Sequence, residues 1–194
     1  MPRRIFIAIK LPEKIKSQFI NYQRKWPDLP IKWTKKDNLH ITLVFIGYVK
    51  DEEIPEICQI VEEIAGKNSI FTISLNKIVY APPKKMPPRM VWVSGEKSEE
   101  LTKLQRSLEN SLLASPLKKN IKQERLYSPH VTLGRIKRWD FKQLEIEERP
   151  SINENVSFNF EVSSIEIMES QLKRTGAEYT VLESVPLINE IMKQ

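Results

Sequence analysis

A four-residue pattern occurs twice in this chain, once in each half. The pattern is a histidine, an apolar residue, a threonine and a leucine (HxTL), and it occupies residues 40–43 and residues 130–133. The two copies contain both of the histidines present among the 194 residues. Each copy is built on β-branched and other apolar residues, which favour a strand. The fold of this chain therefore has to accommodate two similar histidine-bearing strands.

The predicted elements around the two copies follow the same order. Alternating apolar residues predict strands over residues 4–10 and 90–94. Each of these strands is followed by a helix, the first beginning near Pro12 and the second capped by Ser98, and then by a histidine-bearing strand. This repetition predicts a duplicated α+β fold with a pseudo-twofold axis.

The remaining segments show the periodicities of strands and helices. Asp51 is the predicted N-cap of a helix that reaches Gly66, and Gly47 is predicted to end the strand before it. A short helix is predicted around residues 141–144. The other predicted strands span residues 31–33, 39–46, 70–81, 130–136, 156–168 and 179–186.

The composition excludes several classes of protein. A hydrophobic share of 40% with 29% charged residues is typical of a globular domain. The apolar runs are strand-sized, far below the roughly 20 residues that cross a bilayer, and the first residues lack the cleavage site of a signal peptide. We therefore expect a cytoplasmic protein without a membrane segment. The net charge of +6 favours polyanionic partners, nucleic acid first, although a solvated surface rich in lysine and glutamate also explains it.

The two histidine segments suit acid–base chemistry at phosphorus. Alternation along a strand points His40 and Thr42 to one face, and it does the same for His130 and Thr132. Imidazole has a reference pKa of about 6.5, so one ring can take a proton from an attacking oxygen while the other gives one to the leaving oxygen. The threonine hydroxyls can donate hydrogen bonds to the non-bridging phosphate oxygens.

Other uses of these residues fit the sequence less well. A single histidine in a strand is more often structural than catalytic, but the shared context around both histidines favours a catalytic pair. No carboxylate or cysteine stands at metal-ligand spacing from either histidine, and no glycine-rich phosphate loop is found. We therefore expect no metal and no cofactor. The single cysteine, Cys58, excludes an internal disulfide.

The chain resembles the bacterial and archaeal RNA 2′,3′-cyclic phosphodiesterases, also called 2′–5′ RNA ligases, within the two-histidine phosphoesterases. The resemblance extends over almost the whole chain, and two HxTL segments with these flanks make it specific. It is carried by residues 4–8, Trp33, NLHITLVFIG (38–47), residues 88–89, PHVTLGR (129–135), residues 169–172, Gly176 and Tyr179. Gly134 departs from the family, which commonly has alanine there.

The resemblance implies one domain, residues 1–194, made of two intertwined lobes, with two antiparallel sheets facing a central cleft and helices on the outer faces. It implies metal-independent hydrolysis of a terminal 2′,3′-cyclic phosphate on RNA, tRNA fragments included, to a 2′-phosphate. By position, His40 matches the histidine that protonates the leaving 3′ oxygen, and His130 matches the one that activates water. Arg135, five residues after His130, matches an arginine that binds the phosphate.

Three aromatic residues are further candidates for substrate binding, and each has a structural alternative. Phe45 is expected on the face of His40, where it either lines the cleft or packs in the core. Trp33 and Tyr127 either stack on a terminal base or pack locally. Several basic residues either track the RNA backbone or are simply solvated, namely Lys84, Lys85, Arg89 and residues 118–122.

The sequence leaves two alternatives to hydrolysis open. The same chemistry in reverse joins RNA ends through a 2′–5′ linkage when a 5′-hydroxyl replaces water. The other alternative is a non-catalytic RNA- or nucleotide-binding module on the same fold, and the two intact histidine segments argue against it. A monomer is the default oligomeric state.

Overall fold

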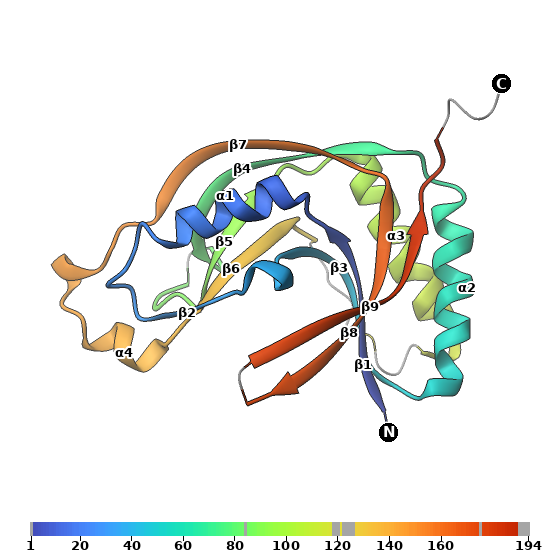
Figure 1. Cartoon of the computed structure of the whole chain (residues 1–194), viewed down its shortest axis with the longest axis horizontal. Coiled ribbons are helices and arrows are strands. Elements are labelled where there is room, and N and C mark those ends of the chain that lie inside the picture. Colours follow the sequence, from blue (N-terminus) through green and yellow to red (C-terminus); the bar gives the residue numbers. More distant parts are fainter. Residues whose placement is uncertain (1, 84, 118–120, 122–126, 175, 190–194) are drawn as a thin grey trace.

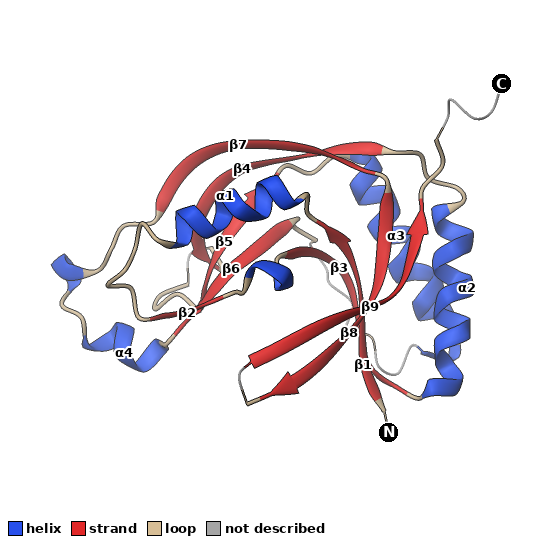
Figure 2. Ribbon diagram, viewed as in Figure 1, coloured by secondary structure: helices blue, strands red, loops and turns tan. Residues whose placement is uncertain are grey.

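Nine strands form one curled antiparallel sheet in the computed structural model, which describes residues 2–83, 85–117, 121, 127–174 and 176–189 (Figures 1 and 2). The strands are β1 (Arg3–Lys10), β2 (Ile31–Trp33), β3 (His40–Val49), β4 (Phe71–Ala81), β5 (Met90–Gly95), β6 (His130–Ile136), β7 (Asn153–Val162), β8 (Ser164–Lys173) and β9 (Gly176–Pro186). The α-helices are α1 (Glu13–Gln23), α2 (Ile54–Ala65), α3 (Glu99–Ala114) and α4 (Arg138–Gln143). Within these residues, every helix is too short or too polar to span a bilayer.

The sheet has two halves that meet in the middle. Its strand order is β7-β4-β5-β6-β3-β1-β8-β9, with β2 also pairing with β6. We call β7, β4, β5, β6 and β2 the β6 lobe, and β3, β1, β8 and β9 the β3 lobe. The chain exchanges strands between them, because the early strand β4 lies in the β6 lobe and the late strands β8 and β9 lie in the β3 lobe. The predicted α+β fold is confirmed, and the two predicted sheets are the lobes of one continuous sheet.

The helices pack on one face of the sheet. In the β6 lobe, Phe19 of α1 packs edge-on against Phe158 of β7, with ring centroids 5.0 Å apart. In the β3 lobe, α2 packs beside α3 and against β8 and β9 (Figure 1). Ile41 of β3 and Val131 of β6 belong to the same apolar core as Phe19. Alternation then turns the histidine that precedes each core residue to the other face.

Capping explains where α3 begins and revises where α2 begins. Ser98 Oγ accepts a hydrogen bond from the Leu101 N–H at 3.1 Å, so the predicted cap of α3 is confirmed. Asp51 does not cap α2 directly. It begins a 3-10 turn, and Glu53 occupies the N-cap position of α2.

The prediction that Gly47 ends a strand is wrong. β3 continues to Val49, and Gly47 lies inside it opposite Ile5, next to a register shift. Its φ of 94° is a left-handed conformation that glycine adopts without a steric penalty. The residue therefore allows an irregularity within the strand and does not terminate it.

The single strand predicted over residues 156–168 is in fact two strands. β7 ends at Val162 and β8 begins at Ser164. β7 pairs with β4 in the β6 lobe, whereas β8 pairs with β1 in the β3 lobe, so the chain crosses between lobes at this point. Both segments have strand propensity, and propensity does not reveal the partner of each segment.

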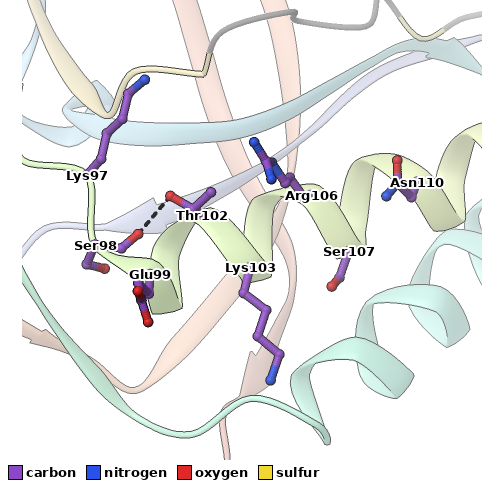
Figure 3. Close-up of a pocket in the computed structure, with 8 residues that line it drawn as sticks. All are labelled: Lys97, Ser98, Glu99, Thr102, Lys103, Arg106, Ser107 and Asn110. Carbon is purple, nitrogen blue, oxygen red and sulfur yellow. Dashed lines mark hydrogen bonds between the residues drawn. The ribbon is translucent and has the colours of Figure 1, made fainter.

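A shallow hollow of about 470 Å³ lies along the exposed face of α3 (Figure 3). Lys103, Arg106 and Ser107 are among the side chains that line it. Thr102 Oγ1 donates to the Ser98 carbonyl at 2.7 Å, so these two polar groups already form a hydrogen bond within the first turn of the helix. The hollow is the solvated side of an amphipathic helix whose leucines face the core.

Candidate active site

The two histidine strands lie side by side in the middle of the sheet. They pair antiparallel at Ile41 of β3 and Val131 of β6. One position to either side of this pair, each histidine lies across from the threonine of the other strand, on the face opposite Ile41 and Val131. The structure thus brings together four predicted site residues, namely His40, Thr42, His130 and Thr132.

This register makes the two histidines diagonal neighbours across one strand pair. Diagonal positions of this kind lie about 7–8 Å apart, with their Cβ atoms somewhat closer. The two rings also interact electrostatically, because a charge on His130 lowers the pKa of His40. A gap of this size between two imidazoles can hold one phosphate group.

The same backbone contact orients both imidazoles. His40 Nδ1 lies 2.7 Å from the carbonyl oxygen of Asn38, and His130 Nδ1 lies 2.8 Å from that of Ser128. A carbonyl only accepts, so Nδ1 carries the hydrogen in each ring and Nε2 is the nitrogen that exchanges a proton. His40 Nε2 is 3.0 Å from Thr42 Oγ1, which donates to it when the ring is neutral.

His40 is packed among aromatic rings of the β3 lobe. The ring centroids of Phe6 and Tyr179 lie 5.0 and 5.1 Å from that of His40, and Tyr179 meets it edge-on. Phe6 is 2% exposed and also contacts Phe45, at 5.9 Å between centroids. Burial among these rings lowers the pKa of His40 to about 4, against the opposing effect of the Asn38 carbonyl. Free His40 is therefore neutral near neutral pH.

His130 is stacked on a single tryptophan of the β6 lobe. The ring of Trp92 lies nearly parallel to that of His130, with an interplanar angle of 19° and 3.7 Å between centroids. Burial lowers the pKa of His130, and its hydrogen bond to the Ser128 carbonyl opposes this shift. The face of an indole attracts a cation, so Trp92 stabilises His130 in its charged form and fixes the plane of the ring.

A β-bulge at the leucine of each HxTL segment changes the face of the sheet to which the following side chains point. Leu43 is skipped in the β1–β3 register, and Leu133 is skipped in the β5–β6 register. The alternation shifts by one after each bulge, so the fifth residue after each histidine lies on the histidine face. These residues are Phe45 in β3 and Arg135 in β6. Simple alternation would have placed Val44 there instead of Phe45.

Phe45 and Arg135 are both open to solvent. The side chain of Phe45 is 51% exposed beside the ring of Phe6. Arg135 is exposed, and its Nη1 lies 3.9 Å from the sulfur of Met90. An exposed ring near one histidine and an exposed guanidinium beyond the other form the two flanks of the site.

Trp33 and Tyr127 both contact other residues of the protein. Trp33 stacks on Trp26 with 6.4 Å between ring centroids, and it lies so close to Gly134 that a Cβ there would be 2.9 Å from its ring. The same Cβ would lie 2.6 Å from Ile31 Cδ1, which explains glycine at this position. The hydroxyl of Tyr127 donates to the Thr42 carbonyl at 3.1 Å and so ties the two lobes together. Base stacking by Trp33 and Tyr127 stays a prediction without support from these contacts.

Three ring neighbours of the histidines were not singled out from the sequence as site residues. They are Phe6 of β1, Trp92 of β5 and Tyr179 of β9. Phe6 and Trp92 lie on strands that pair with distant strands, and Tyr179 lies on β9, whose hairpin partner β8 pairs with the distant strand β1, so only the strand order reveals their positions. Of the predicted basic residues, Lys85 and Arg89 are exposed, while Lys84, residues 118–120 and Lys122 lie outside the described residues. The described part of the chain holds no group of three metal-ligating side chains.

Comparison with known proteins supports the duplication directly. A sequence model of the family described as LigT like Phosphoesterase matches residues 9–92 and matches again at residues 93–179. The chain belongs to the LigT-like phosphoesterase family. The two matches correspond to the two halves of the chain, each with one HxTL segment. The predicted family is therefore confirmed.

Relatives and solved structures match nearly the full length. The RNA 2′,3′-cyclic phosphodiesterase of Methanocaldococcus jannaschii is 31% identical over 182 residues, which are 93% of this chain and 98% of the relative. The protein of the same name from Thermotoga maritima is 31% identical, covering 92% of each chain. A crystal structure of a Thermus thermophilus protein superposes with a TM-score of 0.82 at 26% identity, over 96% of this chain and 99% of that one. Escherichia coli LigT complexed with 3′-AMP gives 0.76 at 26% identity, over 97% and 100%.

Proposed function

We propose that the protein hydrolyses 2′,3′-cyclic phosphate ends of RNA to 2′-phosphates, with His40 and His130 as an acid–base pair and without a metal ion. The observation that carries the proposal is the pair of histidines on adjacent strands, each with its Nδ1 bonded to a carbonyl two residues earlier, which leaves Nε2 as the nitrogen that exchanges a proton. The relatives named RNA 2′,3′-cyclic phosphodiesterase and the LigT complex with 3′-AMP support the substrate class.

The reaction needs one proton acceptor and one proton donor. A water oxygen attacks phosphorus while His130 Nε2 takes a water proton, and the bond between phosphorus and O3′ breaks as His40 gives a proton to O3′. The products are a 2′-phosphate and a 3′-hydroxyl. The stacked indole of Trp92 stabilises the imidazolium that forms on His130, and the apolar surroundings of His40 favour the neutral ring that it becomes. The charge of the bound phosphate raises the pKa of His40, so that the ring holds the proton it donates.

The groups around the gap suit an anion. Two hydroxyls and a guanidinium, from Thr42, Thr132 and Arg135, can donate hydrogen bonds to the non-bridging oxygens, where negative charge concentrates in the transition state. Magnesium and calcium prefer carboxylate and carbonyl oxygens, which this donor set does not offer. We infer that the protein stabilises the phosphate charge with these three side chains.

The exposed ring of Phe45 is the proposed platform for the terminal base. Half of its surface is open, it lies on the histidine face, and it is supported from below by Phe6. Single-stranded RNA is commonly bound by stacking of bases on such rings. Because all of these groups come from one chain, we propose that the enzyme works as a monomer, and we place it in the cytoplasm.

The test uses a synthetic oligoribonucleotide that ends in a 2′,3′-cyclic phosphate, assayed in the presence of a metal chelator. We expect accumulation of the 2′-phosphate, and we expect His40→Ala and His130→Ala each to lower kcat by about 10²- to 10⁴-fold. Ser107→Ala, on the exposed face of α3, is the matched control and should behave as wild type (Figure 3). Undiminished turnover in either histidine variant, or dependence on added metal, would contradict the mechanism.

The same assay separates the two alternatives. An oligonucleotide with a 5′-hydroxyl is added in excess over the cyclic-phosphate RNA, and a 2′–5′-linked product above the hydrolytic background would favour end joining as the biological role. Retention of the cyclic-phosphate RNA on the protein with no turnover of any such end would favour a binding module.

A further inference from the structure

Two cations lie directly opposite each other beside the proposed phosphate site. Lys32 of β2 pairs with Arg135 of β6, and both side chains are exposed. Like charges in directly opposite positions of an antiparallel pair destabilise the sheet. Among the described residues, no carboxylate forms an ion pair with either cation. Two neighbouring cations without a carboxylate partner are suited to binding two anionic groups that lie next to each other.

Lys32 faces the same side of the sheet as the histidines. Arg135, Thr132 and His130 pair with alternate residues of β5, so all three share one face, and Lys32 shares it through its pairing with Arg135. The strand β2 lies along the same edge of β6 as β3 does, farther from the histidine pair. The amine of Lys32 is therefore part of the same surface as the active site.

The amine also lies where the two lobes approach each other. Lys32 Nζ is 3.3 Å from the point where a Cβ on Gly176 would stand, and Gly176 begins β9 at the tip of the β8–β9 hairpin. Figure 1 shows this hairpin projecting away from α2 and α3. Asn38 Nδ2 donates to the Ala177 carbonyl at 2.7 Å and holds the hairpin near the entrance to β3. Lys32 of the β6 lobe thus lies against the tip of the β8–β9 hairpin, which belongs to the β3 lobe.

The strand geometry sets how far Lys32 lies from the reacting phosphate. His40 lies across from Thr132, and Lys32 lies across from Arg135, three residues farther along β6 with one of them in a bulge. At about 3.3 Å per residue, this is about 7–10 Å along the strand. A group held between the histidines is therefore one phosphate position away from the amine of Lys32.

We propose that Lys32 binds the phosphodiester that precedes the terminal nucleotide, so that the site selects an RNA chain over a nucleoside 2′,3′-cyclic phosphate. This inference rests on the proposed function. Arg135 then lies between two successive phosphates, with the reacting one on the side of Thr132 and the preceding one on the side of Lys32.

The experiment compares two dinucleotides that end in the same 2′,3′-cyclic phosphate. One has a normal phosphodiester between its nucleosides, and the other has a neutral methylphosphonate. For wild type, we expect kcat/KM to be about fivefold higher with the charged linkage, since an exposed ion pair contributes a factor of this size. Lys32→Gln should reduce this ratio to about one, and Lys32→Arg should retain it.

A matched control and a second readout keep the result specific. Lys103→Gln on the exposed face of α3 removes the same charge elsewhere and should retain the wild-type ratio (Figure 3). With a longer cyclic-phosphate RNA, the slope of log KM against log salt should become shallower by about 0.7 in Lys32→Gln, as expected for the loss of one phosphate contact. Equal melting temperatures of the variants establish that folding is unaffected.

The outcomes distinguish this inference from the function on which it rests. If wild type hydrolyses neither dinucleotide, the proposed function fails. If wild type hydrolyses both with equal kcat/KM, the function stands and the inference is overturned. The inference is also overturned if Lys32→Gln lowers kcat/KM equally for both linkages, because Lys32 would then contact the reacting phosphate.

Discussion

The two lobes carry the same histidine segment on the same kind of strand, but its surroundings differ. In both lobes an HxTL leucine forms a β-bulge, and a carbonyl two residues before the histidine binds Nδ1. The β3 lobe surrounds its histidine with aromatic rings and exposes Phe45, whereas the β6 lobe stacks its histidine on Trp92 and exposes Arg135 with Lys32. Duplication thus supplies two matched imidazoles, and the neighbouring strands differ, so that one lobe exposes an aromatic ring and the other exposes two cations, which agrees with the proposed base-binding and phosphate-binding roles.

One pair of equivalent positions shows how the divergence arises. Ala8 of β1 lies across from Thr42, and Trp92 of β5 lies across from Thr132. The small side chain of Ala8 is fully buried, beside the aromatic cluster of Phe6, so no ring stacks beneath His40 from that position. The large side chain of Trp92 fills the equivalent position and lies parallel to His130. The difference between alanine and tryptophan at this position therefore contributes to the different electrostatic surroundings of the two imidazoles.

The largest expected effect separates the roles of the two histidines. His40→Ala and His130→Ala should each lower kcat by about 10²- to 10⁴-fold with a normal substrate. A substrate with sulfur in place of the leaving 3′ oxygen needs no protonation of its leaving group. With this substrate, we expect rescue of most of the lost activity in His40→Ala and no rescue in His130→Ala, measured as single-turnover rates. Rescue of the opposite variant would reverse the assignment of acid and base.

The next prediction compares Phe45 and Arg135, which occupy the fifth position after His40 and after His130. Arg135→Met removes a charged donor to the phosphate and should lower kcat/KM by about 10- to 100-fold, mostly through kcat. Phe45→Leu removes a stacking surface and should raise KM by about fivefold or more, with kcat nearly unchanged. Steady-state kinetics on one cyclic-phosphate oligonucleotide measure both. If Phe45→Leu lowered kcat and left KM unchanged, the base-binding role of this flank would be wrong.

A smaller effect tests the stacked indole. Trp92→Leu keeps an apolar neighbour but removes the attraction between the indole face and an imidazolium, so the pKa of His130 should fall further and kcat/KM should fall by about fivefold. The pKa is measured from the ring proton signals in an NMR titration, where two histidines give two resolvable sets. The signals of His40 provide the internal control, and an unchanged pKa of His130 would show that the stacking has no electrostatic role.

A separate effect is on stability. The pKa of His40 is about 4 in the folded protein and about 6.5 in an unfolded chain, so between these values the unfolded chain binds more protons. The free energy of unfolding should therefore rise with pH from about 4 to 6.5, by about 2 kcal/mol for this partly buried group, and level off above. Urea titrations across this range measure the slope, which should be shallower in His40→Asn. An equal slope in the variant would assign the pH dependence to other groups.

Much of the site follows from local sequence, and the rest depends on strand pairing. Alternation alone places Thr42 beside His40 and Ile41 in the core. The cap at Ser98 is also a local feature, because its hydrogen-bond partner is the Leu101 N–H three residues later. The ring neighbours of each histidine cannot be predicted from local sequence. Trp92, for example, lies against His130 only because β5 pairs with β6. The bulge at each HxTL leucine also needs a partner strand to define it, and only this bulge explains why Phe45 lies on the predicted face of His40.

Longer-range pairing also explains the two strand predictions that are wrong. The boundary at Ser163 divides two segments of similar propensity, and only their pairing with β4 and β1 separates them into different lobes. Glycine is common where strands end, yet β3 continues past Gly47 because β1 pairs with β3 residues on both sides of it. The packing of Trp33 likewise depends on Trp26 and Gly134, which lie against it from different elements.

The proposed mechanism requires two imidazoles that contact one phosphate. The direct measurement is an NMR titration of both histidines with and without one equivalent of a nucleoside 2′-phosphate, the proposed type of product. In the free protein, both pKa values should lie below 6.5, with the hydrogen on Nδ1 in the neutral rings. With the ligand bound, both pKa values should rise together, because one anion lies near both rings. A rise for only one histidine, or for neither, would contradict the shared site.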